Sequence, residues 1–343
     1  MLKELCLTSF VNGQSFNLIN KIKKYLAKRD KKKELVYSFD KVGNFIIEKN
    51  CSGSKLATII ASLDEAALIV TSVLDDGRLA FDTIGIEGTN LIGKSFLVGE
   101  NRLPAVVGFT PIHLQHRKNI EASKIKVEDL SLTIGAKTKE EALAKVSLGD
   151  YAVYSDYYKK NGSMVFASRL DNRASVWVAL ELLFSNLVKV GLKVVLTQVS
   201  KAYPWGASAL SSILPSKTNI VLQTVASNDF PFSAYNIDNK KQSNKTQEVG
   251  LGKGSVLVTM DDGHISSLSH FISLSNVAQK LRLPIQVVKL NTKGEAALFA
   301  NGNFGLPTIT VGIPCRYSNS PISIINYKDA TNTIRLLEEY LSS

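Results

Sequence analysis

Acidic, serine and lysine side chains lie next to three of the apolar segments of this 343-residue chain. Asp64 comes just after the apolar run ATIIA (57–61), and Asp171 precedes a long apolar segment. Ser200 and Lys201 follow the apolar run KVVLTQV. In α/β proteins, binding and catalytic groups collect at the carboxyl ends of the strands. These positions are therefore the first candidates for chemistry.

Each carboxylate allows a functional and a structural interpretation. Asp171 could be a metal ligand or a base directed into a cleft, or it could cap the following helix and interact favourably with the helix dipole. On that stretch alone, capping is favoured. Asp64 and its neighbour Glu65 could form a carboxylate pair, or they could be turn residues before the next strand.

Ser200 and Lys201 could act as a nucleophile and its base, because serine–lysine pairs are a known variant of nucleophilic catalysis. The two residues are adjacent at the end of an expected strand, where successive side chains point to opposite faces. This geometry disfavours a direct dyad. The residue types alone leave open what a serine and a lysine do at such a position.

The histidines and one glycine-rich segment give weaker signals. His113 and His116 have a spacing that two zinc ligands could use, but no cysteine or carboxylate cluster accompanies them, and a structural zinc needs about four ligands. His264 and His270 flank an expected helix start. The segment 250–254 contains a lysine but lacks the phosphate-loop pattern, so a nucleotide site is not expected.

The second half of the chain alternates apolar strands with amphipathic helices. Helical segments separate the strands that we expect at 193–199, 219–225, 254–260, 285–290 and 308–313. Such alternation predicts an α/β fold with a helix-flanked sheet. The early apolar run 57–61 resembles these strands and is assigned to the same sheet.

A different pattern of short β-like runs and turns covers residues 85–165, with one helical stretch at 137–146. The sequence Asp75-Asp76-Gly77 between two apolar runs indicates a hairpin. We therefore predict a β-rich module at 74–163, inserted into an α/β domain that is formed by 1–73 plus 164–343.

Composition and charge give limits on location and partners. The composition is that of a globular protein, with 45% hydrophobic residues. Cys6, Cys51 and Cys315 are odd in number and widely spaced, as expected for free thiols in a reducing cytoplasm. No apolar run approaches the ~20 residues that a membrane helix needs, and the N-terminus lacks a signal-peptide pattern. We expect a cytoplasmic protein with no membrane partner.

A net charge of +11 raises the question of nucleic-acid binding. The lysines are scattered, however, and the arginine–aromatic pattern of single-strand binders is absent. The charge is therefore assigned to a solvated, lysine-rich surface, and a nucleic-acid partner is not expected.

The order of the motifs resembles the glutamyl/leucyl aminopeptidase family of dinuclear zinc peptidases, whose members build tetrahedral (TET-type) dodecamers. The resemblance extends from about residue 2 to the C-terminus. It rests on the segments ASLDEAALIV, DDGRLAFDTIG, GKSFLVG, AVVGFTPIHL, VEDLSLTIGA, GDYAVY, SRLDNRASVWVALELL, VGLGKGSVLVTMDDG and GLPTITVGIPCRYSNSP. It implies an α/β domain with a helix-flanked mixed sheet, interrupted by an inserted β-barrel-like dimerisation domain.

The resemblance also implies where the zinc site of the family would lie in this chain. The family's first ligand is a histidine in a His-x-Asp motif, and that histidine corresponds to Ser62, while the supporting aspartate is Asp64. The bridging aspartate is Asp171. The family's Glu-Glu pair, a general base followed by a ligand, corresponds to Ser200 and Lys201.

The last two ligand positions are also substituted. An aspartate ligand corresponds to Gln223, and the final histidine to Asn319. One of five ligand positions is thus retained, in Asp171, and the base is replaced. We therefore expect a divergent member with no catalytic residue, no metal ligand set and no cofactor where the family uses zinc or cobalt. An ion pair between Lys201 and Asp171 is predicted, with Ser62, Gln223 and Asn319 hydrogen-bonding around it.

The sequence supports three functional interpretations. The first is a catalytically degenerate homologue that acts as a non-catalytic subunit, a peptide-binding protein or an assembly protein, as a homo-oligomer or in a hetero-oligomer with an active paralogue. The second is an active, metal-dependent glutamyl/leucyl-type aminopeptidase that releases N-terminal residues from peptides. The third is a metal-free hydrolase that uses serine and lysine.

Overall fold

The chain folds into two compact units. In this computed structural model the described residues are 1–11, 16–53, 55–86, 91–109, 126–198, 201, 205–210, 216–229, 248–292, 294–300 and 305–342. The first unit, here the α/β unit, comprises Met1–Asp64, Tyr158–Ser318 and Ile322–Ser343. The second, here the β unit, comprises Glu65–Tyr157 and Asn319–Pro321.

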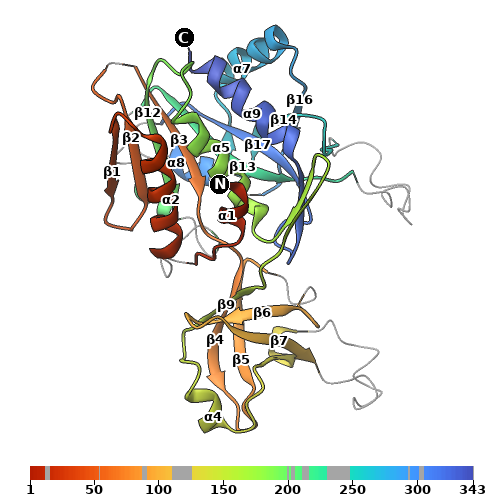
Figure 1. Cartoon of the computed structure of the whole chain (residues 1–343). Helices are drawn as coiled ribbons and strands as arrows, with labels where there is room; N and C mark the ends of the chain where they lie inside the picture. Colours follow the sequence, from red (N-terminus) through yellow and green to blue (C-terminus); the bar gives the residue numbers. More distant parts are fainter. Residues whose placement is uncertain are drawn as a thin grey trace, which may run out of the picture. The chain divides into compact units, whose positions relative to one another are not determined.

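A twelve-stranded mixed sheet forms the centre of the α/β unit (Figure 1). Its strands are β1 Leu35–Phe39, β2 Phe45–Lys49, β3 Leu56–Ser62, β10 Tyr158–Asn161, β11 Met164–Ala167, β12 Gly191–Thr197, β13 Thr218–Ala226, β14 Ser255–Asp261, β15 His264–Ile265, β16 Ile285–Lys289, β17 Thr308–Arg316 and β18 Ser323–Asn326. The main path runs β1-β2-β12-β3-β13-β17-β18-β11-β10, and β14 pairs with β15, β16 and β17.

Four parallel strands, β12, β3, β13 and β17, lie side by side in this sheet. Each was predicted from a short apolar run, and such runs are typical of strands that are buried on both faces. Their side chains alternate between two cores: Ile59 and Val194 belong to one, and Ile60 and Val195 to the other. The alternation explains why the sheet needs helices on both sides.

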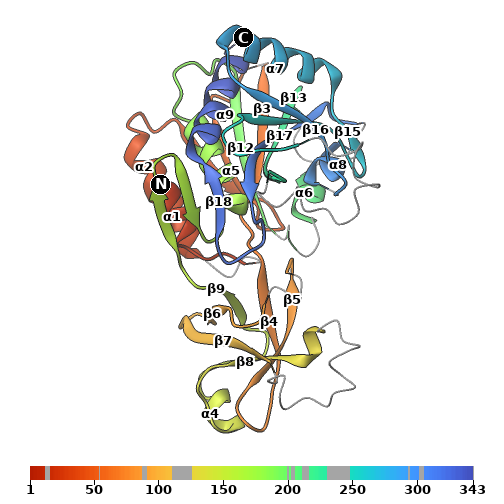
Figure 2. The same ribbon diagram turned by 90° about the vertical axis from the view of Figure 1, so that its right-hand side faces the viewer.

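Helices cover both faces of the sheet (Figure 2). The larger core contains side chains of α1 Leu2–Cys6, α2 Phe16–Arg29, α5 Leu170–Leu182, α7 Leu268–Leu281 and α9 Tyr327–Tyr340. The smaller core, on the other face, contains side chains of α6 Trp205–Leu210 and α8 Glu295–Ala300. The predicted helix-flanked mixed sheet is confirmed. None of the helices in the described ranges is long and apolar enough to span a membrane.

The helix before β12 is shorter than its apolar sequence suggests. The apolar segment 175–190 has the composition of one continuous helix, but α5 ends at Leu182. The chain then turns through Leu183 and Phe184 and enters β12 at Gly191, where an added Cβ would meet the side chain of Leu56 at 2.7 Å. The same Cβ would lie 2.6 Å from the Asn50 carbonyl oxygen, so the start of β12 packs closely against the neighbouring backbone.

The β unit is a closed antiparallel barrel with the strand order β4-β5-β8-β7-β6-β9. Its elements are β4 Ala67–Val73, β5 Leu79–Ile84, β6 Ser95–Val98, β7 Leu103–Phe109, the short helix η3 Val127–Asp129, β8 Leu130–Thr133, α4 Lys139–Leu143 and β9 Tyr151–Tyr154. The predicted hairpin joins β4 to β5, with Gly77 at φ +78° and against the carbonyl of Ala136. A barrel-like unit within the α/β chain is thus confirmed.

Candidate functional site

The carboxyl ends of the parallel strands bring several predicted site residues together. In the sheet register, Thr197 of β12 pairs with Ser62, the last residue of β3. Leu222 of β13 pairs with Ala61, which places Gln223 level with Ser62 at the same edge. Side chains separated by more than 100 positions in the sequence therefore meet because neighbouring parallel strands end together.

Asp171 lies at this edge and is held by two side chains from other elements. Its Oδ2 accepts from the Lys201 Nζ at 3.1 Å, and its Oδ1 accepts from the Thr224 hydroxyl at 2.7 Å. The side chains of Lys201 and Asp171 are only 15% and 10% exposed. The predicted ion pair is thus present, in a setting where little water screens it.

Local backbone geometry directs Asp171 away from the helix that follows it. Asp171 and Asn172 have non-helical dihedral angles. The Asn172 Oδ1 accepts from the backbone N–H of Thr224 at 3.2 Å. The capping role, which the local sequence favoured, is therefore not what Asp171 does.

A second set of contacts fixes the end of β12 next to this pocket. The Asn44 side chain is fully buried, donates to the Gly206 carbonyl at 2.9 Å and accepts from the Gln198 backbone N–H at 2.9 Å. The Gln198 side chain donates to the Gly43 carbonyl. The β1–β2 turn, β12 and α6 are thereby tied together just before Lys201.

The loop after β3 is supported from below by a buried arginine. Arg173 has no exposed surface and donates to the backbone carbonyls of Leu5, Leu63 and Thr8. Asp64 is 1% exposed, and its backbone N–H lies 3.3 Å from the Ser62 hydroxyl oxygen that accepts it. Ser62 and Asp64 are thus part of a buried turn at the edge of the pocket.

Not every predicted position belongs to this group. Ser200 lies outside the described residues, as do His113 and His116. Asn319 belongs to the β unit, where it has φ 59° and its carbonyl accepts from the Tyr154 hydroxyl at 3.4 Å. The group within the α/β unit therefore consists of Ser62, Asp64, Asp171, Lys201 and Gln223.

Two polar side chains near the pocket were missed by the sequence analysis. Thr224 donates to Asp171, and its only sequence signal is the polar pair Gln-Thr within an otherwise apolar strand. Asp261, the last residue of β14, is 1% exposed, and neither of its oxygens has a well-formed hydrogen bond. Burial raises the pKa of the Asp261 carboxyl. A Cβ on Gly294 would lie 2.9 Å from Asp261 and 3.6 Å from Gln223, so both side chains approach the same backbone position.

The remaining polar candidates have structural roles. Gly252 and Gly254 donate their backbone N–H groups to the Asp329 carboxylate at 2.7 and 2.9 Å, so the glycine-rich segment anchors α9. The His270 ring lies 2.8 Å from the Tyr340 hydroxyl. Burial lowers the pKa values of His264 and His270. Burial also raises the pKa of the Cys315 thiol to about 12, and the negative charge of Asp171 adds to this. Such a thiol is a poor nucleophile.

Comparison with known proteins places this architecture in one family. The family model of the M42 glutamyl aminopeptidases matches residues 43–336. The chain belongs to the M42 glutamyl aminopeptidase family. A putative aminopeptidase of Acetivibrio thermocellus is 26% identical over 305 residues, which cover 88% of this chain and 86% of the relative.

Solved structures of M42-type peptidases share the fold over nearly the whole chain. The TET aminopeptidase from Thaumarchaeota archaeon SCGC AB-539-E09 has a TM-score of 0.90 at 21% identity, and the match covers 99% of this chain and 95% of the other. The TET1 peptidase of Pyrococcus horikoshii has a TM-score of 0.82 at 26% identity, over 99% and 98% of the two chains. That peptidase can assemble into a tetrahedron or a large octahedral shell.

The family assignment corrects one expectation. We expected no cofactor, because the pocket lacks most of the expected ligands, but M42 family members are metal-dependent aminopeptidases. A few side chains in one pocket are a weaker guide to the cofactor of a protein than a family match that spans residues 43–336. Metal dependence is therefore the property expected of this family, and a functional test of this chain has to include metal ions.

The donor atoms in the pocket decide whether a pair of zinc ions fits there. Both oxygens of Asp171 accept from protein donors, and one of those donors is the Lys201 ammonium group. Gln223 offers a neutral amide. Within the described ranges, no three His, Cys, Asp or Glu side chains are grouped so that they could hold a metal ion. These residues do not fit a dinuclear zinc centre, and we assign no reaction step to one.

Proposed function

We propose that this M42 family member does not hydrolyse peptides at the Asp171 pocket and acts as a non-catalytic subunit, a peptide-binding protein or an assembly protein. One observation carries the proposal: the Lys201 ammonium group lies 3.1 Å from Asp171, at the position where the family resemblance implies a carboxylate ligand. A cation in that place neutralises the one retained ligand carboxylate, which supports a binding rather than a hydrolytic role.

Elementary chemistry supports the same proposal. Hydrolysis of a peptide bond at neutral pH needs a group that activates water and a base that takes up its proton. The position that the resemblance assigns to the base is Ser200, whose hydroxyl is not a base at neutral pH. Gln223 and Ser62 are neutral side chains, suited to hydrogen-bonding a peptide backbone.

Family membership favours a second candidate, an active metal-dependent aminopeptidase with a remodelled site. The third candidate, a serine–lysine hydrolase, has less support because the Lys201 ammonium is engaged with Asp171. A single experiment separates the first two. The full-length protein is incubated with peptides that carry lysine, glutamate or leucine at the N-terminus, with Zn²⁺ or Co²⁺ added, and the released amino acid is measured by mass spectrometry.

We expect no metal-stimulated release above the level of a heat-inactivated sample. The matched control is the multiple variant Ser62→His, Ser200→Glu, Lys201→Glu, Gln223→Asp, Asn319→His, which restores the residue types implied by the resemblance and which we expect to gain turnover. Metal-dependent release by the parent protein that disappears in Asp171→Ala would establish the aminopeptidase instead.

We further propose that the protein assembles with copies of itself, and that the β unit serves as the assembly module. Support comes from the Pyrococcus horikoshii TET1 peptidase, a 26% identical structure that forms closed shells. The β unit also presents apolar side chains to its surface, among them Val106 at 47% exposure and Leu148 at 61%. Contact with another copy would remove these apolar side chains from water.

A further inference from the structure

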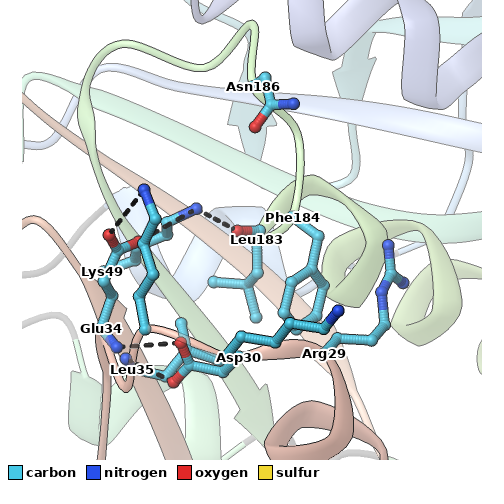
Figure 3. A pocket seen from close by; sticks show the side chains of 10 residues that line it. Arg29, Asp30, Glu34, Leu35, Lys49, Leu183, Phe184 and Asn186 are labelled. Carbon is cyan, nitrogen blue, oxygen red and sulfur yellow. Dashed lines mark hydrogen bonds and ion pairs between the residues drawn. The ribbon is translucent and has the colours of Figure 1, made fainter.

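A recess of about 220 Å³ lies at the C-terminal end of α2 (Figure 3). It is away from the sheet edge that carries Asp171, because its Lys49 pairs with Leu192 near the start of β12. Its walls come from the turn after α2, from the last residue of β2 and from the segment that follows α5. Four of its lining side chains are cationic (Arg29, Lys31, Lys32 and Lys49), and two are anionic (Asp30 and Glu34). The recess therefore carries an excess of positive charge within a small volume.

The two carboxylates do not neutralise the lysines fully. Asp30 is occupied by the backbone, since its oxygens accept from the N–H groups of Glu34 and Leu35 at 2.9 and 3.0 Å. Glu34 lies between two ammonium groups, 4.0 Å from Lys32 and 3.9 Å from Lys49. Both distances are too long for a hydrogen bond. The ammonium groups therefore keep donors for another oxygen.

The other three cations, Arg29, Lys49 and Lys31, differ in how far the protein already binds their donors. Arg29 pairs with Glu181 at 2.7 Å and stacks over the Phe184 ring at 4.1 Å, so its charge is compensated. The Lys49 ammonium group donates one of its three N–H bonds to the Leu183 carbonyl at 2.7 Å. The ammonium group of Lys31 makes no hydrogen bond or ion pair within the described chain. Lys31, Lys32 and Lys49 thus line one recess, at whose rim the Lys32 side chain is 83% exposed.

We propose that this recess binds a small, multiply charged oxyanion of the phosphate type, held by Lys31, Lys32 and Lys49. A tetrahedral oxyanion offers acceptors in several directions, whereas a carboxylate offers two oxygens in one plane, so three separate ammonium groups suit the former. A recess of about 220 Å³ holds more than one water molecule, so it has room for a phosphate group. The site is independent of the Asp171 pocket and of its proposed function.

The test is a calorimetric titration of the full-length protein with inorganic phosphate and with pyrophosphate, at constant ionic strength. We expect saturable binding of one anion per chain with a dissociation constant of roughly 1 mM, tighter for pyrophosphate because of its larger charge. Acetate at the same concentration is expected not to bind. Equal heats for acetate and phosphate, or no saturable heat, would overturn the proposal.

Three variants test the assignment of residues. Lys31→Ala and Lys32→Ala should each weaken binding by about threefold to tenfold. Glu34→Gln removes the competing carboxylate and should strengthen binding by a similar factor, a gain that misfolding cannot produce. The matched control is Lys328→Ala, which removes the same charge from an exposed position in α9. Equal affinities in all four variants would show that the anion binds elsewhere.

Discussion

The Lys201–Asp171 pair lies at the centre of the pocket, and its contribution to stability can be tested. Two opposite charges that are only 15% and 10% exposed depend on one another, because removing one leaves the other in a poorly hydrated place. Thr224 satisfies the second carboxylate oxygen and so fixes the orientation of Asp171. The pair therefore stabilises the edge of the sheet whether or not a ligand is bound.

We predict that Lys201→Met lowers the free energy of unfolding by about 2–3 kcal/mol, because it leaves the Asp171 carboxylate without its cation. Adding Asp171→Asn should restore much of the loss, giving a coupling energy above 1 kcal/mol in a double-mutant cycle. Chemical denaturation measures both quantities.

The control for this cycle is an ion pair of similar length on the surface. Lys253 lies 2.8 Å from Glu248, but their side chains are 52% and 62% exposed, so Lys253→Met should cost less than about 1 kcal/mol. If the two single changes at Lys201 and Asp171 were additive, the pair would not be a unit and the proposed role of Lys201 would fail.

The elements around the pocket are joined where β12 ends and α6 begins. Gly206, at the start of α6, packs against the Gln198 carbonyl, and an added Cβ would also lie 2.8 Å from the Asn44 Oδ1. No side chain fits there without moving backbone. The position of Lys201, four residues after Thr197, depends on this close contact between strand and helix.

We predict that Gly206→Ala lowers the free energy of unfolding by about 2 kcal/mol or more, because the methyl group overlaps a backbone carbonyl. Thermal unfolding of the full chain is the measurement. Gly53→Ala is the matched change: a Cβ at Gly53 meets nothing within 4 Å, so we expect less than about 0.5 kcal/mol there. Similar costs at the two glycines would contradict the packing argument.

The whole molecule combines an α/β unit with a closed antiparallel barrel, and TET peptidases share this fold over nearly the whole chain. A closed barrel has no free edge strands, so contacts between copies would have to use outward-facing side chains rather than sheet extension. Val106 and Leu148 are such side chains in the β unit.

We predict that light scattering of the full-length protein gives a mass several times that of one chain. The double variant Val106→Asp, Leu148→Asp should reduce this mass, because it places charges on apolar surface that another copy would cover. Leu187→Asp, at a 50% exposed site in the α/β unit, is the matched control and should leave the mass unchanged. A monomeric parent protein would contradict the assembly proposal.

Much of the fold could be predicted because the signals were local. Short apolar runs between helical segments are typical of central parallel strands, and β3, β12, β13, β14, β16 and β17 lie where such runs were found. The hairpin at Asp75-Asp76-Gly77 needed only its turn residues. Element ends were less predictable. The apolar segment extends to Val190, but α5 ends eight residues earlier, at Leu182.

Sequence by itself determined the family, the α/β class with its inserted barrel, and the residue types at the ends of the strands, because each depends on local pattern or on the order of motifs. The family resemblance predicted that Lys201 pairs with Asp171, but only the tertiary structure shows that the two side chains meet, at 3.1 Å. Whether Asp171 caps a helix or pairs with Lys201 depends on where β13 and the end of β12 lie, and no local pattern contains that distance. The same holds in part for the recess beside α2. Lys31 and Lys32 are adjacent in the sequence, but Lys49 joins them only because β2 and the segment after α5 pack beside the helix.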